Sequence, residues 1–522
     1  MKLEPDPART SRLISLLLLT VTMTILLFIT AQFFRRSVAA IRYPYELDYG
    51  EGQVLLDTLT LMNGGSIYDA PDSFPFTVSN YPPVYHVLAA ALSSVTGAPL
   101  ASGRALSALS TLLAGAFVGL IVMMASTRGR PTHFSPAAAA ASTAAAMLFV
   151  SVWPVFIWGV FMRVDMLAIL FSLAGLWAHL RWHAHPVLRH VCVALFLLAV
   201  FTRQAAVAGA ASAIITTFVV DRRRGLRMGA AFCGAVIAIS AVIYAATHGQ
   251  FYFHTVTATA TAFHWAGILV QLWYPLAQYR WLTLLAALGA IIALRSRESD
   301  TTSAGEQLRL AVPAYMVVSF LVSLTSGKVG SNINYVLELI AGACMVVGML
   351  VGRILQERPP GWRAWMGPAA MIILLIQIVT PSLTPRLTDW WRFRIDPDTS
   401  AGDRALDRLR YAEGPVFSED TTLLVLAGRP IEYQCYELTQ LSLTGHWDQR
   451  PLLERFNRHD FALVLLRFDI ADPTPLARTR FTPEMLVAIR ENYRPVEKRG
   501  PYWFLVPSVP GAVGRRASPG VS

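Results

Sequence analysis

Charged residues are scarce in this chain. Only 15% of its 522 residues are Asp, Glu, Lys or Arg, whereas a typical soluble domain carries about 25%. Apolar residues make up 54% of the chain, and its mean hydropathy is +0.46. This composition excludes an ordinary soluble globular protein and predicts a polytopic α-helical membrane protein.

Cysteines and acidic residues are also few. The 4 cysteines lie far apart, without a disulfide framework or a CxxC metal motif. Asp and Glu number 33 against 44 Lys and Arg, which gives a net charge of +11. Most of the basic residues outside the C-terminal region lie in short loops between apolar segments, where they are a topology signal. The excess of positive charge therefore reflects membrane orientation and does not indicate a nucleic-acid partner; the expected surroundings of the chain are membrane lipid.

The long apolar segments predict about eleven transmembrane helices. They are Ile14–Phe34, Leu106–Ser126, Ala137–Trp158, Met166–Leu180, Cys192–Thr202, Ala205–Val220, Met228–Thr247, Leu276–Leu294, Leu310–Thr325, Tyr335–Val351 and Met366–Thr380. A further stretch, Val84–Leu100, is apolar but short and interrupted by Gly and Pro, so we expect a juxtamembrane or re-entrant helix there. The first segment has no small-residue cleavage site and is interpreted as an anchor.

Loop charges predict the orientation of these segments. If the N-terminus is cytoplasmic, the cytoplasmic loops hold more than twice as many Lys and Arg as the outer loops. This asymmetry predicts a multi-pass protein of the inner (plasma) membrane. The first outer loop then covers residues 35–104, and the C-terminal region lies outside the cell.

The composition changes after Pro381. We divide the chain into a transmembrane domain at 1–384, a soluble extracytoplasmic α/β domain at 385–510 and a disordered tail at 511–522. Short apolar runs beginning at Gly414, Thr422, Phe461 and Pro501 are typical of buried strands. Helical patterns at Arg404–Tyr411 and Pro483–Asn492 separate them.

The first outer loop is an acidic island in a chain that has few acids. Glu46, Asp48 and Glu51 lie within six residues, beside two glycines that let the backbone turn freely. The island cannot enter hydrocarbon. It closes with Asn80-Tyr-Pro-Pro-Val-Tyr-His86, whose prolines suit the start of a helix.

Other unusual polar residues fall on the same predicted side of the membrane. They are Arg163, Asp165, Arg203, Lys328, Asn332, Asn334, Tyr335 and Glu338. Acids that face cations at one membrane surface suit a reaction that deprotonates an acceptor while an anionic leaving group departs. Structural interpretations stay open for four of these residues and for His86: Asp165 as a helix cap, Arg163 and Arg203 as interfacial arginines, Glu338 as a buried pair, and His86 as an interfacial histidine.

Taken in order, these elements resemble the GT-C superfamily of membrane glycosyltransferases. The likeness is to the branches of protein mannosyltransferases, aminoarabinose transferases and bacterial family-39-like enzymes. The matching residues are Asp48 with Glu51 in ELDYGEG, Pro82-Pro83 in NYPPVYH and Asp165 in RVDMLA.

The resemblance implies that a hexose or pentose is transferred, with inversion, from a polyprenyl-phosphate-linked donor to a cell-envelope glycan, lipid or protein acceptor. Asp48 takes the position of the catalytic base, with Glu51 as the alternate. His86 stands where mannosyltransferases carry a lysine, and Tyr81 stands where several relatives have a basic residue. The contact to the donor phosphate is therefore open among His86, Arg163, Arg203 and Lys328. Also open is whether Asp48 and Asp165 hold a divalent metal ion such as Mg or Mn.

Two other classes of function compete with an enzyme. A transporter or flippase of lipid-linked glycans should show repeat-related halves and polar residues near the middle of the membrane. A non-catalytic glycan-binding scaffold would not need Asp48 and Asp165 to lie near each other.

Overall fold

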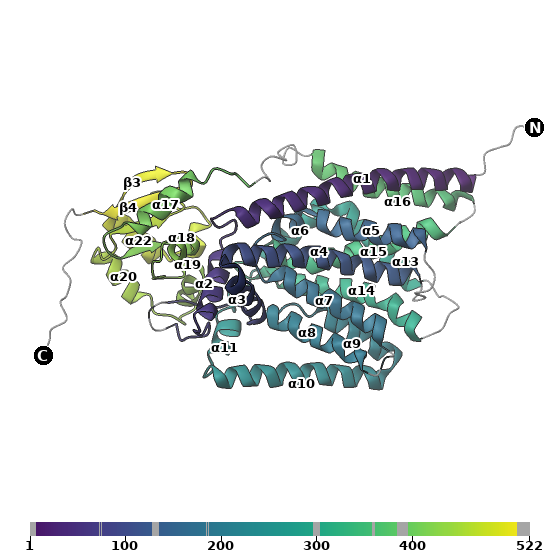
Figure 1. The fold of residues 1–522 in the computed structure, drawn as a ribbon, viewed down its shortest axis with the longest axis horizontal. Coiled ribbons are helices and arrows are strands. Elements are labelled where there is room, and N and C mark those ends of the chain that lie inside the picture. Colours follow the sequence, from purple (N-terminus) through teal and green to yellow (C-terminus); the bar gives the residue numbers. More distant parts are fainter. Residues whose placement is uncertain are drawn as a thin grey trace, which may run out of the picture.

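The computed structural model describes residues 7–508 apart from 72–73, 75, 128–134, 184, 186, 296–302, 358–360 and 384–394. A long helical bundle is followed by a small domain that contains the sheet, at one end of the bundle (Figure 1). The predicted boundary at 384/385 and the predicted tail at 511–522 lie outside the described residues.

The bundle is made of long helices. They are α1 (Pro7–Arg42), α4 (Pro99–Ser126), α5 (Pro136–Ser151), α7 (Asp165–Trp182), α8 (Val191–Thr202), α9 (Ala208–Val220), α10 (Arg222–Ala246), α12 (Trp265–Gln278), α13 (Arg280–Arg295), α14 (Ser303–Ser323), α15 (Leu337–Gln356) and α16 (Met366–Leu383). Helix α1 runs along the bundle, so that its first residues lie at the end far from the sheet domain (Figure 1).

Shorter helices connect these elements. They are α2 (Glu51–Met62), α3 (Val84–Thr96), α6 (Trp153–Trp158), η1 (Leu188–His190), α11 (Gln250–Tyr252), the π-helix η2 (Phe253–Thr257), η3 (Leu324–Gly327), η4 (Ile333–Val336) and η5 (Gly361–Trp365). Helices α2 and α3 lie at the end of the bundle that meets the sheet domain (Figure 1).

Length and composition support a multi-pass membrane protein. Among the described residues, 6 helices are long and apolar enough to span a bilayer, or up to 7 if α12 and α13, bent by 89°, form one span. Shorter apolar helices at Val84–Thr96, Pro136–Ser151, Leu188–Thr202 and Ala208–Val220 accompany them. The total of eleven spans therefore stays a prediction. The 13-residue length of α3 agrees with a helix that does not span alone.

Two predicted spans are not single helices. Ala137–Trp158 is broken at Val152, which has an extended backbone, and α6 begins directly after it. Pro154 explains the restart, because proline is tolerated in the first turn of a helix but not in its interior. Likewise Leu276–Leu294 is divided between α12 and α13. The break before α6 directs the chain toward Arg163 and Asp165.

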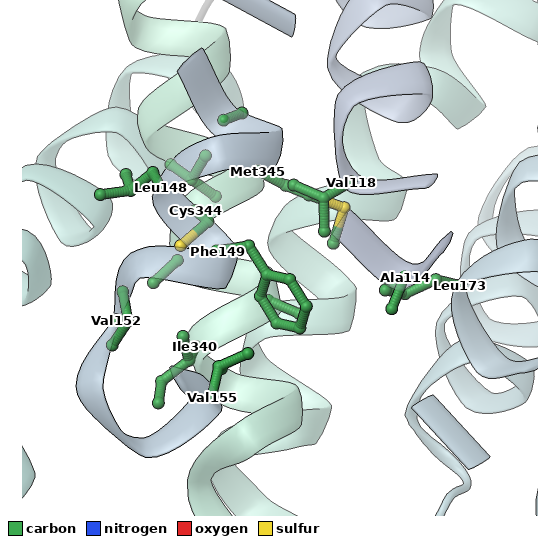
Figure 2. Close-up of a cluster of buried hydrophobic side chains, with 14 of the residues drawn as sticks. Ala114, Val118, Leu148, Phe149, Val152, Val155, Leu173, Ile340, Cys344 and Met345 are labelled. Carbon is green, nitrogen blue, oxygen red and sulfur yellow. The ribbon is translucent and has the colours of Figure 1, made fainter. Parts of the chain in front are cut away.

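The hydrophobic core of the bundle surrounds α15. Ile340, Cys344 and Met345 of this helix meet Phe149 of α5 and Val118 of α4 (Figure 2). Close approach depends on small residues. A Cβ added at Gly348 of α15 would lie 2.6 Å from the Cβ of Ala145 and 2.9 Å from Val122. The core thus fixes the lengthwise position of α4, α5 and α15, and with it the polar residues at their ends.

The C-terminal domain is α/β, as predicted. Its sheet has the order β1-β2-β4-β3, with β1 and β2 parallel and the other pairs antiparallel. The elements are α17 (Ser400–Arg410), β1 (Val416–Ser418), α18 (Thr421–Leu426), α19 (Cys435–Leu443), α20 (Arg450–Asn457), β2 (Leu463–Leu466), α21 (Ala477–Arg480), α22 (Pro483–Asn492), β3 (Tyr493–Arg499) and β4 (Tyr502–Pro507).

One predicted strand in this domain is wrong. The run that begins at Thr422 is helix α18, because the Asp420 side chain accepts a hydrogen bond from the Leu423 backbone N–H and caps the helix. A short buried apolar run does not by itself distinguish a strand from a helix. Strand β3, which the sequence did not reveal, is mostly exposed and carries charged residues.

Candidate active site

Asp48 lies in the turn between α1 and α2 and faces Arg163. Its Oδ2 accepts a hydrogen bond from the Gly50 N–H (3.1 Å) and lies 3.5 Å from Arg163 Nη1. A Cβ at Gly50 would lie 1.2 Å from that Nη1, so only glycine leaves room for the guanidinium. The two side chains keep 19% and 14% of their surface exposed. Burial raises the pKa of Asp48, and the positive charge of Arg163 opposes the rise.

Arg163 is held by aromatic side chains on its other faces. Its Nη2 donates to the Tyr81 hydroxyl (3.1 Å), and its guanidinium lies 5.5 Å from the centre of the Trp158 ring. Within the described part of the chain, its buried Nε has no hydrogen-bond partner. One donor of the guanidinium is therefore available to another acceptor.

Asp165, the first residue of α7, holds a second arginine. It is fully buried and lies 3.2 Å from Arg203 Nη1, through Oδ1. The same oxygen accepts from Asn334 Nδ2 (2.9 Å), and Oδ2 accepts from Trp158 Nε1 (2.7 Å). The Arg203 guanidinium lies 4.9 Å from the centre of the Tyr335 ring. Because Trp158 contacts both Arg163 and Asp165, the two acid–arginine pairs form one connected group.

Glu51 is placed differently from Asp48. Arg104, which like Glu51 is fully buried, donates to it from Nε (2.9 Å) and Nη2 (2.7 Å). The backbone N–H groups of Leu47 (2.6 Å) and Met162 (2.8 Å) donate to the same carboxylate. With four donors and no exposed surface, this carboxylate ties the first loop to α4 and to the chain before Arg163.

Four of the predicted site residues make their contacts elsewhere. His86 is fully buried on α3, and its Nε2 lies 3.7 Å from Asp57 Oδ2. Burial lowers the pKa of His86 to about 4 and raises that of Asp57 to about 8. Lys328 Nζ donates to the Thr259 carbonyl (3.5 Å). The remaining two are Asn332, whose side chain caps η4, and Glu338, which accepts from Ser172 and Tyr315.

The C-terminal domain contributes an acid that sequence reasoning missed. Glu437, in the first turn of α19, accepts a hydrogen bond from Asn80 Nδ2 (3.1 Å) in the NYPPVYH segment. Burial raises the pKa of Glu437 to about 7, and the charge of Arg163 opposes the rise. No local motif surrounds Glu437, so only the docking of the domain reveals it.

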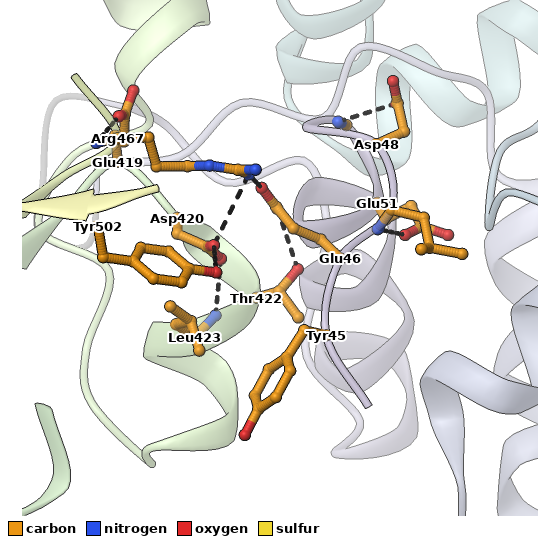
Figure 3. Close-up of polar contacts among 12 residues, drawn as sticks. Tyr45, Glu46, Asp48, Glu51, Glu419, Asp420, Thr422, Leu423, Arg467 and Tyr502 are labelled. Carbon is orange, nitrogen blue, oxygen red and sulfur yellow. Dashed lines mark hydrogen bonds and ion pairs between the residues drawn. The ribbon is translucent and has the colours of Figure 1, made fainter. Parts of the chain in front are cut away.

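A buried ionic cluster docks the domain against the acidic loop. Arg467 pairs with Glu46, lies 3.9 Å from Asp420 Oδ2, and is drawn with both in Figure 3. Thr422 donates to Glu46 Oε2 (3.3 Å). Burial raises the pKa of Glu46 well above its ordinary value. Since Glu46 is two residues before Asp48, this docking fixes the turn that carries the candidate base.

The carboxylates of this site do not match a divalent-metal site. Asp48 faces Arg163, and the two oxygens of Asp165 already accept from Trp158, Asn334 and Arg203. Within the described ranges, no group of three or more His, Cys, Asp or Glu side chains is placed to hold an ion. These donors suit guanidinium groups better than a metal.

Comparison with solved structures identifies the fold. The chain resembles ArnT from Cupriavidus metallidurans bound to undecaprenyl phosphate, with TM-score 0.58 and 12% identity over 94% of this chain and 98% of that one. It also resembles the oligosaccharyltransferase of Archaeoglobus fulgidus crystallised with Zn and sulfate, with TM-score 0.55 and 12% identity over 91% and 71%. Protein-family models and curated proteins gave no match. The chain therefore has a GT-C fold, as the sequence resemblance implied.

Proposed function

We propose that this protein is a membrane glycosyltransferase that moves a sugar from a polyprenyl-phosphate donor to a cell-envelope acceptor. The observation that carries the proposal is the Asp48–Arg163 pair, which is partly exposed and incompletely hydrogen-bonded where the bundle meets the C-terminal domain. The GT-C fold supports it, since ArnT with this fold was crystallised with undecaprenyl phosphate.

In the proposed reaction Asp48 removes the proton from an acceptor hydroxyl. A lipid phosphate is a stable anion and leaves without a general acid, so the main demand is a carboxylate near the anomeric carbon. Attack from the face opposite the phosphate inverts that carbon. Glu51, already bound by four donors, supports the loop in this scheme.

Arg163 and Arg203 stabilise the departing phosphate. Guanidinium groups bind phosphate oxygens in a bidentate manner, and Arg163 Nε has no acceptor among the residues that the structure describes. Asp165 orients Arg203, and Asn334 supports Asp165. The aromatic rings of Tyr81 and Tyr335 limit the movement of the two guanidinium groups. The contacts of His86 and Lys328 lie with other residues, which favours the two arginines for this role.

We place this reaction at the outer face of the plasma membrane, with the N-terminus in the cytoplasm. Cysteine labelling tests the orientation in a Cys233→Ser background. Asp448→Cys in the C-terminal domain should react with a membrane-impermeant maleimide in intact cells, whereas Arg223→Cys in the first turn of α10 should react only after permeabilisation. The reverse pattern would place the site on the cytoplasmic side.

The central experiment measures sugar transfer by purified protein with a panel of polyprenyl-phosphate hexoses and pentoses. Asp48→Asn keeps the shape and removes the base, so turnover should fall by about 10²–10⁴-fold. Asp448→Asn, at an exposed acid paired with Arg450, is the matched control. Full transfer by Asp48→Asn would end this mechanism, and a wild type inactive with every donor would favour a transporter or scaffold.

A further inference from the structure

Glu437 of the C-terminal domain and Asn80 of the NYPPVYH segment form a pair beside the candidate site. Glu437 keeps some exposed surface, and its carboxylate accepts a hydrogen bond from Asn80 Nδ2 (3.1 Å). The other end of the Asn80 amide, Oδ1, is buried and has no partner among the described residues. The pair therefore offers acceptor oxygens of Glu437 and Asn80, beside the second N–H of the Asn80 amide.

Hydrogen bonds between side chains and backbone groups hold both members of this pair in place. Tyr436, next to Glu437, donates its hydroxyl to the Val329 carbonyl (2.6 Å), and Gln434 accepts from the Val78 N–H (2.6 Å). Gln204, which follows Arg203, donates to the Asn80 carbonyl (2.8 Å). These bonds connect the start of α19 to the NYPPVYH segment, and they connect that segment to the residue that follows Arg203. A partly buried carboxylate loses hydration, and this loss is offset only where other groups donate hydrogen bonds to it.

The two arginines and the Glu437–Asn80 pair differ in the hydrogen-bonding groups that they carry. Arg163 and Arg203 present donors, which suit a phosphate, whereas Glu437 and Asn80 present acceptors. Carboxylate and amide oxygens accept hydrogen bonds from hydroxyl groups, and a few placed polar groups usually fix the orientation of a bound ligand. Sugar hydroxyls are the hydroxyl-rich groups in the proposed reaction.

We propose that Glu437 and Asn80 form a subsite that binds sugar hydroxyls. The assignment rests on the proposed function and adds to it a role for the C-terminal domain in substrate recognition. The hydroxyls belong either to the donor sugar or to a glycan acceptor. A merely structural alternative is that Glu437 stabilises the first turn of α19 through the helix dipole.

Kinetics of Glu437→Gln separate these possibilities. The substitution keeps the shape but removes the charge and one acceptor, so KM for one substrate should rise by about 10–100-fold, with kcat much less affected. A rise for the donor or for the acceptor identifies which sugar is bound. Asn80→Ala should raise the same KM by a smaller factor. Glu454→Gln, at an exposed acid paired with Arg458, is the control.

Deoxy-sugar substrates sharpen the test. The wild type should discriminate against the analogue that lacks the bound hydroxyl, because a buried acceptor is then left unpaired, and Glu437→Gln should lose that discrimination. Unchanged KM values for both substrates would overturn the subsite, as would a fall in kcat alone.

Binding of free sugars, measured by saturation-transfer NMR on the solubilised full chain, does not depend on turnover. The wild-type signal should be lost in Glu437→Gln. Equal signals, or none in either protein, would overturn the subsite. Inactivity of the wild type with all donors, by contrast, would count against the proposed function.

Discussion

Asp48 and Glu51 are three residues apart in one loop, and each faces an arginine, yet their surroundings differ. Glu51 and Arg104 are both fully buried, and Glu51 is bound by four donors. Asp48 and Arg163 are partly exposed, and Arg163 keeps a donor without a partner among the described residues. A carboxylate whose acceptor sites are all filled by protein donors can stabilise the fold. A general base must instead come within hydrogen-bond distance of the proton that it removes. From this comparison we propose a structural role for Glu51 and a chemical role for Asp48.

The buried pair should dominate stability. Arg104→Leu leaves the Glu51 carboxylate buried without its charge partner, which should cost about 3–5 kcal/mol in the free energy of unfolding. Chemical or thermal unfolding in detergent measures the loss, and Asp48→Asn is the matched variant that should unfold like the wild type. Equal stability of Arg104→Leu and the wild type would remove the distinction between the two pairs.

The partly exposed pair should dominate turnover. Arg163→Ala removes a guanidinium that we propose binds the donor phosphate, so turnover should fall by ~30–1000-fold, which corresponds to about 2–4 kcal/mol of transition-state stabilisation. Arg163→Lys should restore only part, since a lysine lacks the planar fork. Single-turnover assays separate this loss from donor binding. If Arg163→Ala and Arg203→Ala both turn over normally, the phosphate is bound elsewhere.

Gly50 tests the contact between Asp48 and Arg163 without altering either side chain. In Gly50→Ala the new Cβ must displace the Arg163 guanidinium, and such a misplacement should lower turnover by about 10–100-fold. Gly234→Ala in α10, where a Cβ would meet nothing within 4 Å, is the control. Normal turnover in Gly50→Ala would show that this close approach is not needed.

The pH profile should report the pKa of Asp48. A general base works only when deprotonated, so turnover falls as the pH drops through its pKa, and burial raises that pKa above the ordinary aspartate value. Because Arg163 lowers it, the residual activity of Arg163→Ala should have its acid limb at higher pH. An acid limb that stays in place in Arg163→Ala would indicate a different titrating group.

The smallest expected effect is that of a metal chelator. Asp48 and Asp165 contact arginine and neutral donors, so EDTA should leave turnover of the wild type unchanged. Inhibition by EDTA that Mg or Mn reverses would show that these carboxylates exchange their partners for an ion during turnover.

Much of the fold followed from local patterns. The apolar segments, α17, α22 and three of the four strands come from composition and periodicity, which are properties of neighbouring residues. The errors arose where a single residue decides the secondary structure. The break at Val152, followed by Pro154, divides a predicted span, and the cap from Asp420 makes α18 of a predicted strand. The sequence named Asp48, Asp165, Arg163 and Arg203 as candidates, but it kept Glu51 as the alternate base and His86 as a possible phosphate contact, and their burial appears only in the structure.

The sequence by itself determined that this is a multi-pass membrane protein with a small α/β domain, because hydropathy and charge density act along the chain. Only the tertiary structure decided which polar residues meet. Arg104, 53 residues after Glu51, occupies that carboxylate, and Trp158 joins the two acid–arginine pairs. Glu437 reaches Asn80 across 357 residues. Electrostatic and hydrogen-bond partners are set by distance in space, which the core around α15 and the docking of the C-terminal domain establish.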